Sequence, residues 1–204
     1  MIIGTNNTDE WGVVSTFSIT PPEVVTRYIE IPGRNGMIDA SEALTGYPTY
    51  SDRELSVQLL IVDKTADEFQ KIYDDIYASL HGQRLDASVP HDEGYHYTGR
   101  WAVSSINHET RNVRTIDLIC QCEPYAKKDS VTAKTISTGS LEVSSVMPTK
   151  LTIKATAQTS ITRGGTTTTY SAGTHEIAYP LLVGTETLTI NSGSGTIEWQ
   201  EGKL

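Results

Sequence analysis

Apolar residues between positions 65 and 82 recur at the spacing of one face of an α-helix. The residues that form this face are Phe69, Ile72, Tyr73, Ile76 and Leu80. Thr65 is placed to cap the first turn, Glu68 completes a capping box, and Gly82 follows the last apolar position as a stop signal. The pattern predicts an amphipathic helix over about 65–81 that buries its apolar face against a sheet.

Elsewhere in the first part of the chain the apolar period is two, which is typical of strands. The best examples are Leu55, Val57, Leu59 and Ile61 in 54–62, and Ile116, Leu118, Cys120 and Cys122 in 113–122. A third strand is expected over 100–109. The segment HDEGYHYTGRW at 91–101 is interpreted as a loop whose Tyr95, Tyr97 and Trp101 could stack on a sugar or pack on a neighbouring subunit. We therefore expect an α+β domain of β-sandwich-like sheets with one helix packed on them.

The last part of the chain is predicted to be all-β. Short strands or hairpins are expected at 151–157, 160–170, 175–179 and 188–199. Gly164–Gly165 and the tract NSGSG at 191–195 supply the turns between them. This pattern predicts a small β-sandwich, so the chain as a whole is expected to be mainly β.

The composition changes near residue 128. Residues 1–128 contain 19 acidic and 11 basic residues, whereas residues 129–204 contain 6 and 5. Threonine, which suits strands, rises from 11 residues in the first part to 17 in the second. The polar tract 126–140 lies at the change. We therefore predict two domains, 1–128 and 129–204, with their boundary in this tract.

The 204 residues are 37% hydrophobic and 20% charged, a composition that excludes a disordered chain. The net charge of −9 argues against a nucleic-acid ligand held by phosphate neutralisation. No apolar run approaches the roughly 20 residues that span a bilayer, and the start of the chain lacks the pattern of a secretory signal. A soluble protein without a membrane partner is expected.

Candidate metal ligands are few. Cys120 and Cys122 share one face of a predicted strand, and the chain has no other cysteine. His91 and His96 form the only close histidine pair, and their spacing in a loop does not fix a coordination geometry. Because a structural zinc site needs four such ligands, we predict free buried thiols, a solvated polar loop, no metal and no cofactor. The lack of a disulfide framework suits folding inside a cell.

No catalytic residue is predicted, and the protein is not expected to be an enzyme. Asp74–Asp75 and Asp92–Glu93 are adjacent carboxylates, whereas glycoside hydrolysis needs two carboxyl groups that face each other across a substrate. The chain has no G-x-S-x-G motif for a serine nucleophile. The run PGRNG at 32–36 lacks the Lys-Ser/Thr of a phosphate-binding loop, so we expect a sharp turn there.

Three motifs follow one another along the first part of the chain: IPGRNGMID at Ile31–Asp39, YSDREL at Tyr50–Leu55 and EPYA at Glu123–Ala126. Together with the capped helix and the segment 81–103, this order resembles the distal tail protein (Dit) family of siphophages. The family patterns are an ipGRdG-lD-s turn, a Y-nRel entry to a strand and a dPYay exit, with Glu123 here in place of the usual Asp. The ending ETLTINSGSGTIEWQEGKL looks like the last hairpin of the family's galectin-like β-sandwich.

The resemblance implies a virion structural protein at the phage tail tip, made in the host cytoplasm and without catalysis. Family members assemble their first domains into a homohexameric ring, the baseplate hub. The ring joins the tail tube protein on one side to the tail-associated (Tal-like) adhesin or lysin on the other. DNA passes through the open centre without sequence-specific binding, and an acidic first domain would repel its phosphates. This chain is too short for the carbohydrate-binding modules inserted in longer members.

Two other functions are open at this stage. One is a different ring-forming tail component, such as a tube or terminator protein. The other is a stand-alone carbohydrate-binding module, favoured by the sandwich and the aromatic loop. The PGRNG and EPYA signatures and the added β-sandwich favour the hub, and the sequence identifies no interface residues.

Overall fold

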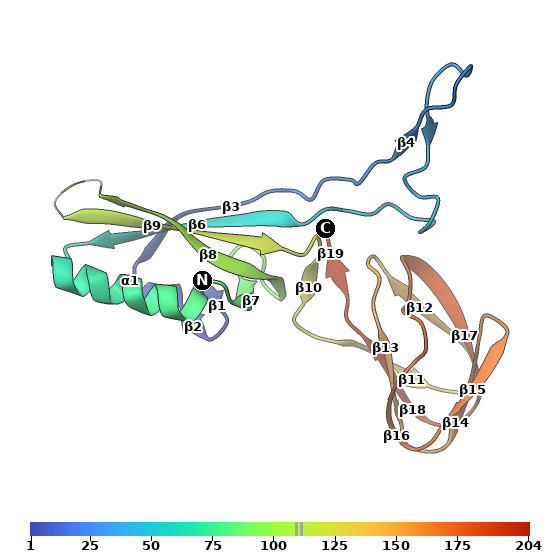
Figure 1. The fold of residues 1–204 in the computed structure, drawn as a ribbon. Coiled ribbons are helices and arrows are strands. Elements are labelled where there is room, and N and C mark those ends of the chain that lie inside the picture. Colours follow the sequence, from blue (N-terminus) through green and yellow to red (C-terminus); the bar gives the residue numbers. More distant parts are fainter. Residues whose placement is uncertain (109, 111) are drawn as a thin grey trace. The chain divides into compact units, whose positions relative to one another are not determined.

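A computed structural model describes residues 1–108, 110 and 112–204. This part of the chain divides into two compact units, residues 1–126 with Leu204, and residues 127–203. Strands dominate both units and the described residues contain a single α-helix, which confirms the mainly β fold class (Figure 1). Whether 1–128 and 129–204 fold as independent domains stays a prediction.

The first unit is built on an antiparallel sheet with the strand order β2-β1-β7-β8-β9-β6-β3. Its strands are β1 (Ile2–Ile3), β2 (Asn6–Asn7), β3 (Val13–Ile19), β6 (Arg53–Val62), β7 (Arg84–Ser88), β8 (Tyr95–His108) and β9 (Val113–Cys122). A short 3-10 helix at Thr8–Glu10 leads from β2 toward β3. The predicted strands at 54–62 and 113–122 are confirmed as β6 and β9, with Leu55 opposite Cys120 and Leu59 opposite Ile116.

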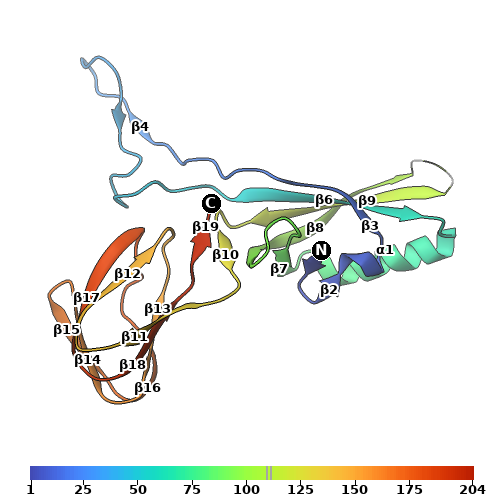
Figure 2. The same ribbon diagram turned by 180° about the vertical axis from the view of Figure 1, so that it is seen from behind.

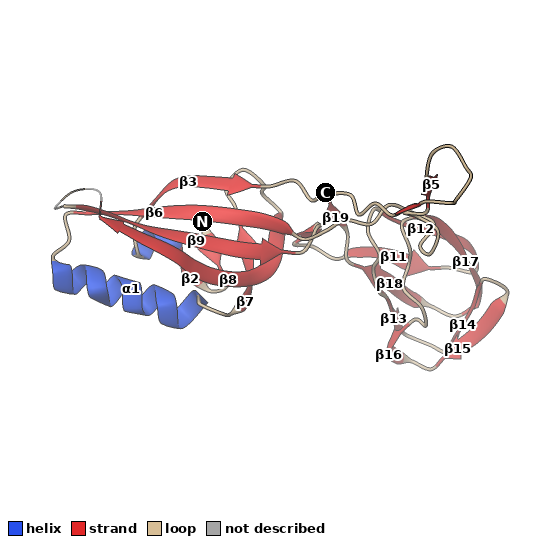
Figure 3. Cartoon of the chain, turned by 45° about the horizontal axis from the view of Figure 1, so that its top comes forward, coloured by secondary structure: helices blue, strands red, loops and turns tan. Residues whose placement is uncertain are grey.

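The helix α1 (Ala66–Leu80) lies along one face of this sheet, as Figures 1 and 3 show. Its capping box is formed as predicted, because the Thr65 hydroxyl accepts from the Glu68 backbone at 3.3 Å while Glu68 accepts from the Thr65 backbone at 2.8 Å. The buried helix residues are Phe69, Ile76 and Leu80, and Ile72 and Tyr73 are partly buried against the same core. The predicted helix and its buried face are therefore confirmed.

The segment interpreted as an aromatic loop is instead largely strand. The strand β8 begins at Tyr95, five residues before the expected strand start at residue 100. Tyr97 and Trp101 point into the core of the first unit, where Trp101 is completely buried. These two rings cannot stack on a sugar or on another subunit, so that interpretation was wrong for them. Gly99 separates them, and a Cβ at Gly99 would lie 2.6 Å from the Cys120 sulfur.

Residues 20–52 connect β3 to β6, and we call this segment the arm. It extends well beyond the end of the sheet in Figures 1 and 2. The arm contains a small ladder of β4 (Tyr28–Ile29) and β5 (Ile38–Asp39), with Ile29 opposite Ile38. Nearer the sheet, a bridge between Val24 and Tyr50 holds its two legs together.

The second unit is a β-sandwich of two four-stranded antiparallel sheets. One sheet contains β11 (Thr132–Ile136), β18 (Gly195–Trp199), β13 (Leu151–Ala155) and β16 (Gly173–Glu176), in that order. The other contains β12 (Gly139–Ser145), β17 (Gly184–Ser192), β14 (Thr159–Arg163) and β15 (Thr166–Tyr170). Residues from both sheets share one core, among them Ile153, Leu188 and Ile197.

Three smaller details complete the description. The strands β10 (Ala126–Lys128) and β19 (Gly202–Lys203) pair with each other. The strand expected at 175–179 ends at Glu176, and the chain then turns into a loop in which Tyr179 has a left-handed φ of 67°. Among the described residues, no helix combines the length and the apolar character that crossing a membrane requires.

Candidate assembly surface

The arm exposes an unusual number of large apolar side chains. They are Val24, Val25, Tyr28, Ile29, Ile31, Met37 and Leu44. Met37 is 61% exposed and Leu44 is 91% exposed. Large apolar side chains that are exposed together on a projecting segment make that segment a candidate interaction site.

The tip of the arm owes its shape to the motif at Ile31–Asp39. The Arg34 backbone donates to the Ile31 carbonyl at 3.1 Å, and Gly33 has a φ of 82°, so the expected sharp turn is confirmed. Asp39 accepts hydrogen bonds from the Ser41 backbone at 2.9 Å and from the Ser41 hydroxyl at 2.5 Å. These bonds hold the pKa of Asp39 below its ordinary value. The Ser41 hydroxyl in turn accepts from the Arg27 backbone at 2.8 Å, which joins the two legs of the arm.

The base of the arm is anchored by Arg53, the first residue of β6. This side chain is buried, its guanidinium donates to the Pro124 carbonyl, and it lies 5.6 Å from the centre of the Tyr97 ring. Within the described residues its Nε has no hydrogen-bond partner, and burial lowers the pKa of Arg53. The Tyr97 hydroxyl donates to Asp92 at 2.6 Å, and burial together with that bond raises the pKa of Tyr97.

Two further contacts join the motifs at the base. The rings of Tyr50 and Tyr125 meet edge to face with centroids 6.0 Å apart. Arg84, at the start of β7, forms an ion pair with Glu123. The YSDREL and EPYA motifs, 71 residues apart along the chain at Arg53 and Pro124, therefore meet in space.

The two cysteines lie beside this base. Both are completely buried, and their sulfur atoms are 3.3 Å apart. The hydrogen bond between them and burial raise the pKa of Cys120, whereas the same bond and the nearby Arg53 guanidinium lower the pKa of Cys122. Both cysteines are free thiols, and the described residues contain no group of three or more His, Cys, Asp and Glu side chains that could hold a metal.

The other candidate residues do not form a reactive centre. His91 packs its ring against Phe17 at 5.4 Å, while His96 belongs to β8. Asp74 and Asp75 lie on the exposed side of α1, where Asp74 accepts from Gln70. Asp92 is the acceptor for the Tyr97 hydroxyl already described.

Sequence reasoning found the turn and the strand entry of the arm but did not predict that 20–52 leaves the sheet. Two signals were available. The segment contains no sustained apolar alternation, and it carries Pro21, Pro22, Pro32 and Pro48, which strand interiors avoid. Whether its apolar side chains are exposed depends on the tertiary contacts of the segment. The local sequence does not show such contacts.

No protein-family model and no curated protein sequence matches the chain. Among solved structures, it matches the crystal structure of the SPP1 Dit protein (gp 19.1), described as a paradigm of the hub adsorption apparatus in phages that infect Gram-positive bacteria. The TM-score is 0.73 at 14% identity, and the match covers 100% of this chain and 98% of the other. The chain therefore has the fold of SPP1 Dit over its whole length.

Proposed function

We propose that this chain is a structural protein of a phage tail tip, a hub built from a ring of six copies. The observation that carries the proposal is the full-length match to SPP1 Dit, which includes both units. A tube or terminator protein is not expected to contain the second unit. The coverage of the whole chain by the match therefore favours the hub over those alternatives. The protein is a virion component made in the host cytoplasm, and its role is structural rather than enzymatic.

The first unit supplies the ring contacts in this proposal. In a closed ring each copy carries two different surfaces, one that reaches out and one that receives. The arm is suited to reach out, since it projects from the sheet and exposes apolar residues such as Met37 and Leu44. Its base is fixed by the buried Arg53 and its tip by Asp39, so the arm is shaped before it binds. Preorganisation of this kind lowers the cost of association.

The ring joins the tail tube protein on one face and a tail-associated protein on the other, and DNA passes through its centre. The first 128 residues carry 19 acidic and 11 basic residues, a balance that disfavours adsorption of DNA to the channel wall. A stable ring contact buries on the order of 1,000 Å² or more. An arm that lies across a neighbouring copy provides area of this order without a large flat interface.

The test is light scattering over a wide range of protein concentrations, paired with negative-stain images. Wild-type protein should form sixfold rings with an open centre at high concentration. The double variant Met37→Asp/Leu44→Asp should move the midpoint of assembly at least about tenfold higher, because charges in an apolar contact oppose association. Val146→Asp, at an exposed apolar position of the second unit, is the matched control and should leave assembly unchanged.

A monomer at every concentration, with or without the tail tube and tail-associated proteins, would refute the ring. Rings that form equally well in the double variant would leave the hub in place but remove the arm from the contact.

A further inference from the structure

The second unit contains a pocket of about 710 Å³, open to solvent, that the tail-tip role does not use. It lies between the edge strand β15 and the loop that joins β16 to β17. Its floor is apolar and is formed by Ile161, Ile177 and Leu181, all buried. Pockets of this size with an apolar floor and a few polar groups are the usual form of a small-ligand site.

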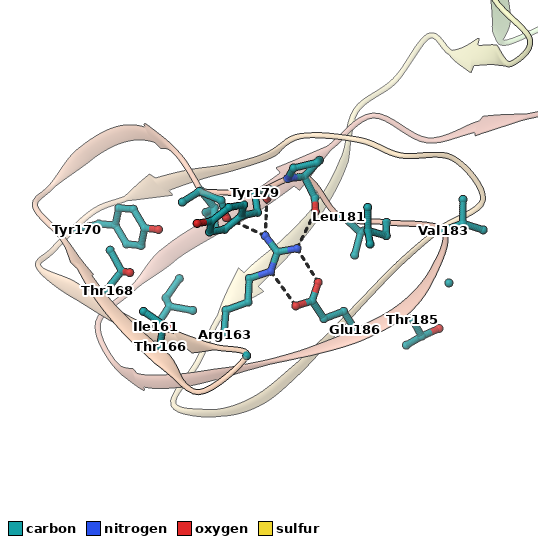
Figure 4. A pocket seen from close by; sticks show the side chains of 16 residues that line it. Ile161, Arg163, Thr166, Thr168, Tyr170, Tyr179, Leu181, Val183, Thr185 and Glu186 are labelled. Carbon is teal, nitrogen blue, oxygen red and sulfur yellow. Dashed lines mark hydrogen bonds and ion pairs between the residues drawn. The ribbon is translucent and has the colours of Figure 1, made fainter. Parts of the chain in front are cut away.

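One wall of the pocket is built around Arg163, whose side chain is only 16% exposed. The guanidinium forms a two-pronged ion pair with Glu186, with Nε–Oε1 and Nη2–Oε2 distances of 2.7 Å each. Its remaining hydrogens go to the loop carbonyls of Ala178 at 3.1 Å, Tyr179 at 2.5 Å and Pro180 at 2.9 Å. Figure 4 shows the guanidinium between the carboxylate of Glu186 and this loop.

Arg163 thereby holds Tyr179 in a conformation that a tyrosine rarely adopts. Tyr179 has a φ of 67°, and its side chain is 84% exposed at the pocket. A left-handed backbone is a cost for a bulky residue, and such strain persists where the surroundings enforce it, often at ligand sites. Tyr170 of β15 lines the same pocket, so two aromatic rings border it.

The remaining polar groups at the rim are threonine hydroxyls. Thr166, Thr168 and Thr185 line the pocket, and their side chains make no hydrogen bond with any residue that the structure describes. The charges of Arg163 and Glu186 are paired with each other. The pocket therefore favours a neutral ligand, with an apolar face for the rings and floor and hydroxyl groups for the rim.

We infer that this pocket binds a neutral saccharide. Sugar rings present a C–H face that packs on tyrosine and an edge of hydroxyls that pair with threonine and tyrosine hydroxyls. The volume accommodates more than one sugar ring, which favours an oligosaccharide over a monosaccharide. The site belongs wholly to the second unit, so it goes beyond the ring and does not depend on it.

The test uses the full chain and a set of neutral trisaccharides built from glucose, rhamnose or N-acetylglucosamine, with inorganic phosphate as a charged probe. Binding is followed by saturation-transfer NMR and calorimetry. At least one trisaccharide should bind, and phosphate should not. Tyr179→Asn should weaken binding at least about tenfold, because it removes the ring while asparagine tolerates the left-handed backbone.

Two controls separate the pocket from other surfaces. Tyr28→Ala removes an exposed tyrosine of the arm and should leave the dissociation constant unchanged. Tyr179→Phe keeps the aromatic face and should retain most of the affinity. The inference is overturned if no trisaccharide binds at about 10 mM, a concentration above ordinary weak affinities. It is also overturned if binding survives Tyr179→Asn, or if phosphate binds in the pocket.

Discussion

Replacing Ile76 with alanine tests whether the apolar face of α1 supports the first unit. Ile76 is completely buried between the helix and the sheet. The substitution removes three carbon atoms, a loss of about 2.4 kcal/mol at roughly 0.8 kcal/mol per buried methylene. If the cavity relaxes only partly, a remaining void of up to roughly 75 Å³ adds up to about 1.8 kcal/mol. We therefore expect the free energy of unfolding to fall by about 2.5–4 kcal/mol.

The assay is urea unfolding followed by circular dichroism at the helical band. The signal reports mainly on the first unit, because α1 is the single α-helix of the described residues. Lys71→Ala, on the exposed side of the same helix, is the control and should change stability by less than about 0.5 kcal/mol. A loss below about 0.5 kcal/mol in Ile76→Ala would refute the reasoning and make this helix face a candidate contact with another subunit.

Four further predictions concern the helix cap, the cysteines and the boundary between the units. Thr65→Ala should cost about 1 kcal/mol at pH 7 through loss of the helix cap. The capping bonds hold the pKa of Glu68 below its ordinary 4.5, so Glu68→Gln should be less stable than wild type above about pH 4.5. The difference in stability should vanish as the pH falls through the lowered pKa. A difference independent of pH would contradict this. Cys120 and Cys122 should react with a thiol reagent only after unfolding, and elemental analysis should find less than stoichiometric zinc. One tightly held metal per chain would disprove the free-thiol state. Mild proteolysis should cut within 126–140, at the exposed residues 129–131, and release a folded first unit. Cuts inside 55–125 that leave the tract 126–140 intact would argue against two domains.

The sequence predicted the elements whose stability is decided locally. The helix was found because its apolar face, Thr65 cap and Gly82 stop lie within one segment. The strands β6 and β9 were found because each alternates apolar and polar residues. The early start of β8 was missed because Gly99 interrupts the alternation of Tyr97 and Trp101, although the close approach of Cys120 requires glycine there.

The arm and the pocket were missed for a different reason. The base of the arm at 20–52 is joined to the rest of the first unit by a contact between Arg53 and Pro124, which are 71 positions apart. The wall of the pocket depends on Arg163 reaching carbonyls 15 to 17 residues later and on Glu186 at 23 residues. Periodicity and composition report on neighbours along the chain, so neither could place these side chains together.

The motif residues of the arm act on backbone geometry and buried contacts. Gly33 and Gly36 take left-handed conformations, Asp39 holds Ser41, whose hydroxyl joins the legs of the arm, and Arg53 anchors its base. None of these roles restricts the residues on the outside of the arm. In the proposed hub, exposed residues such as Leu44 can therefore vary with the surface they contact, while the motif residues keep the arm in place. Substituting Leu44 should then alter assembly alone, whereas substituting Arg53 should alter both assembly and the stability of the first unit.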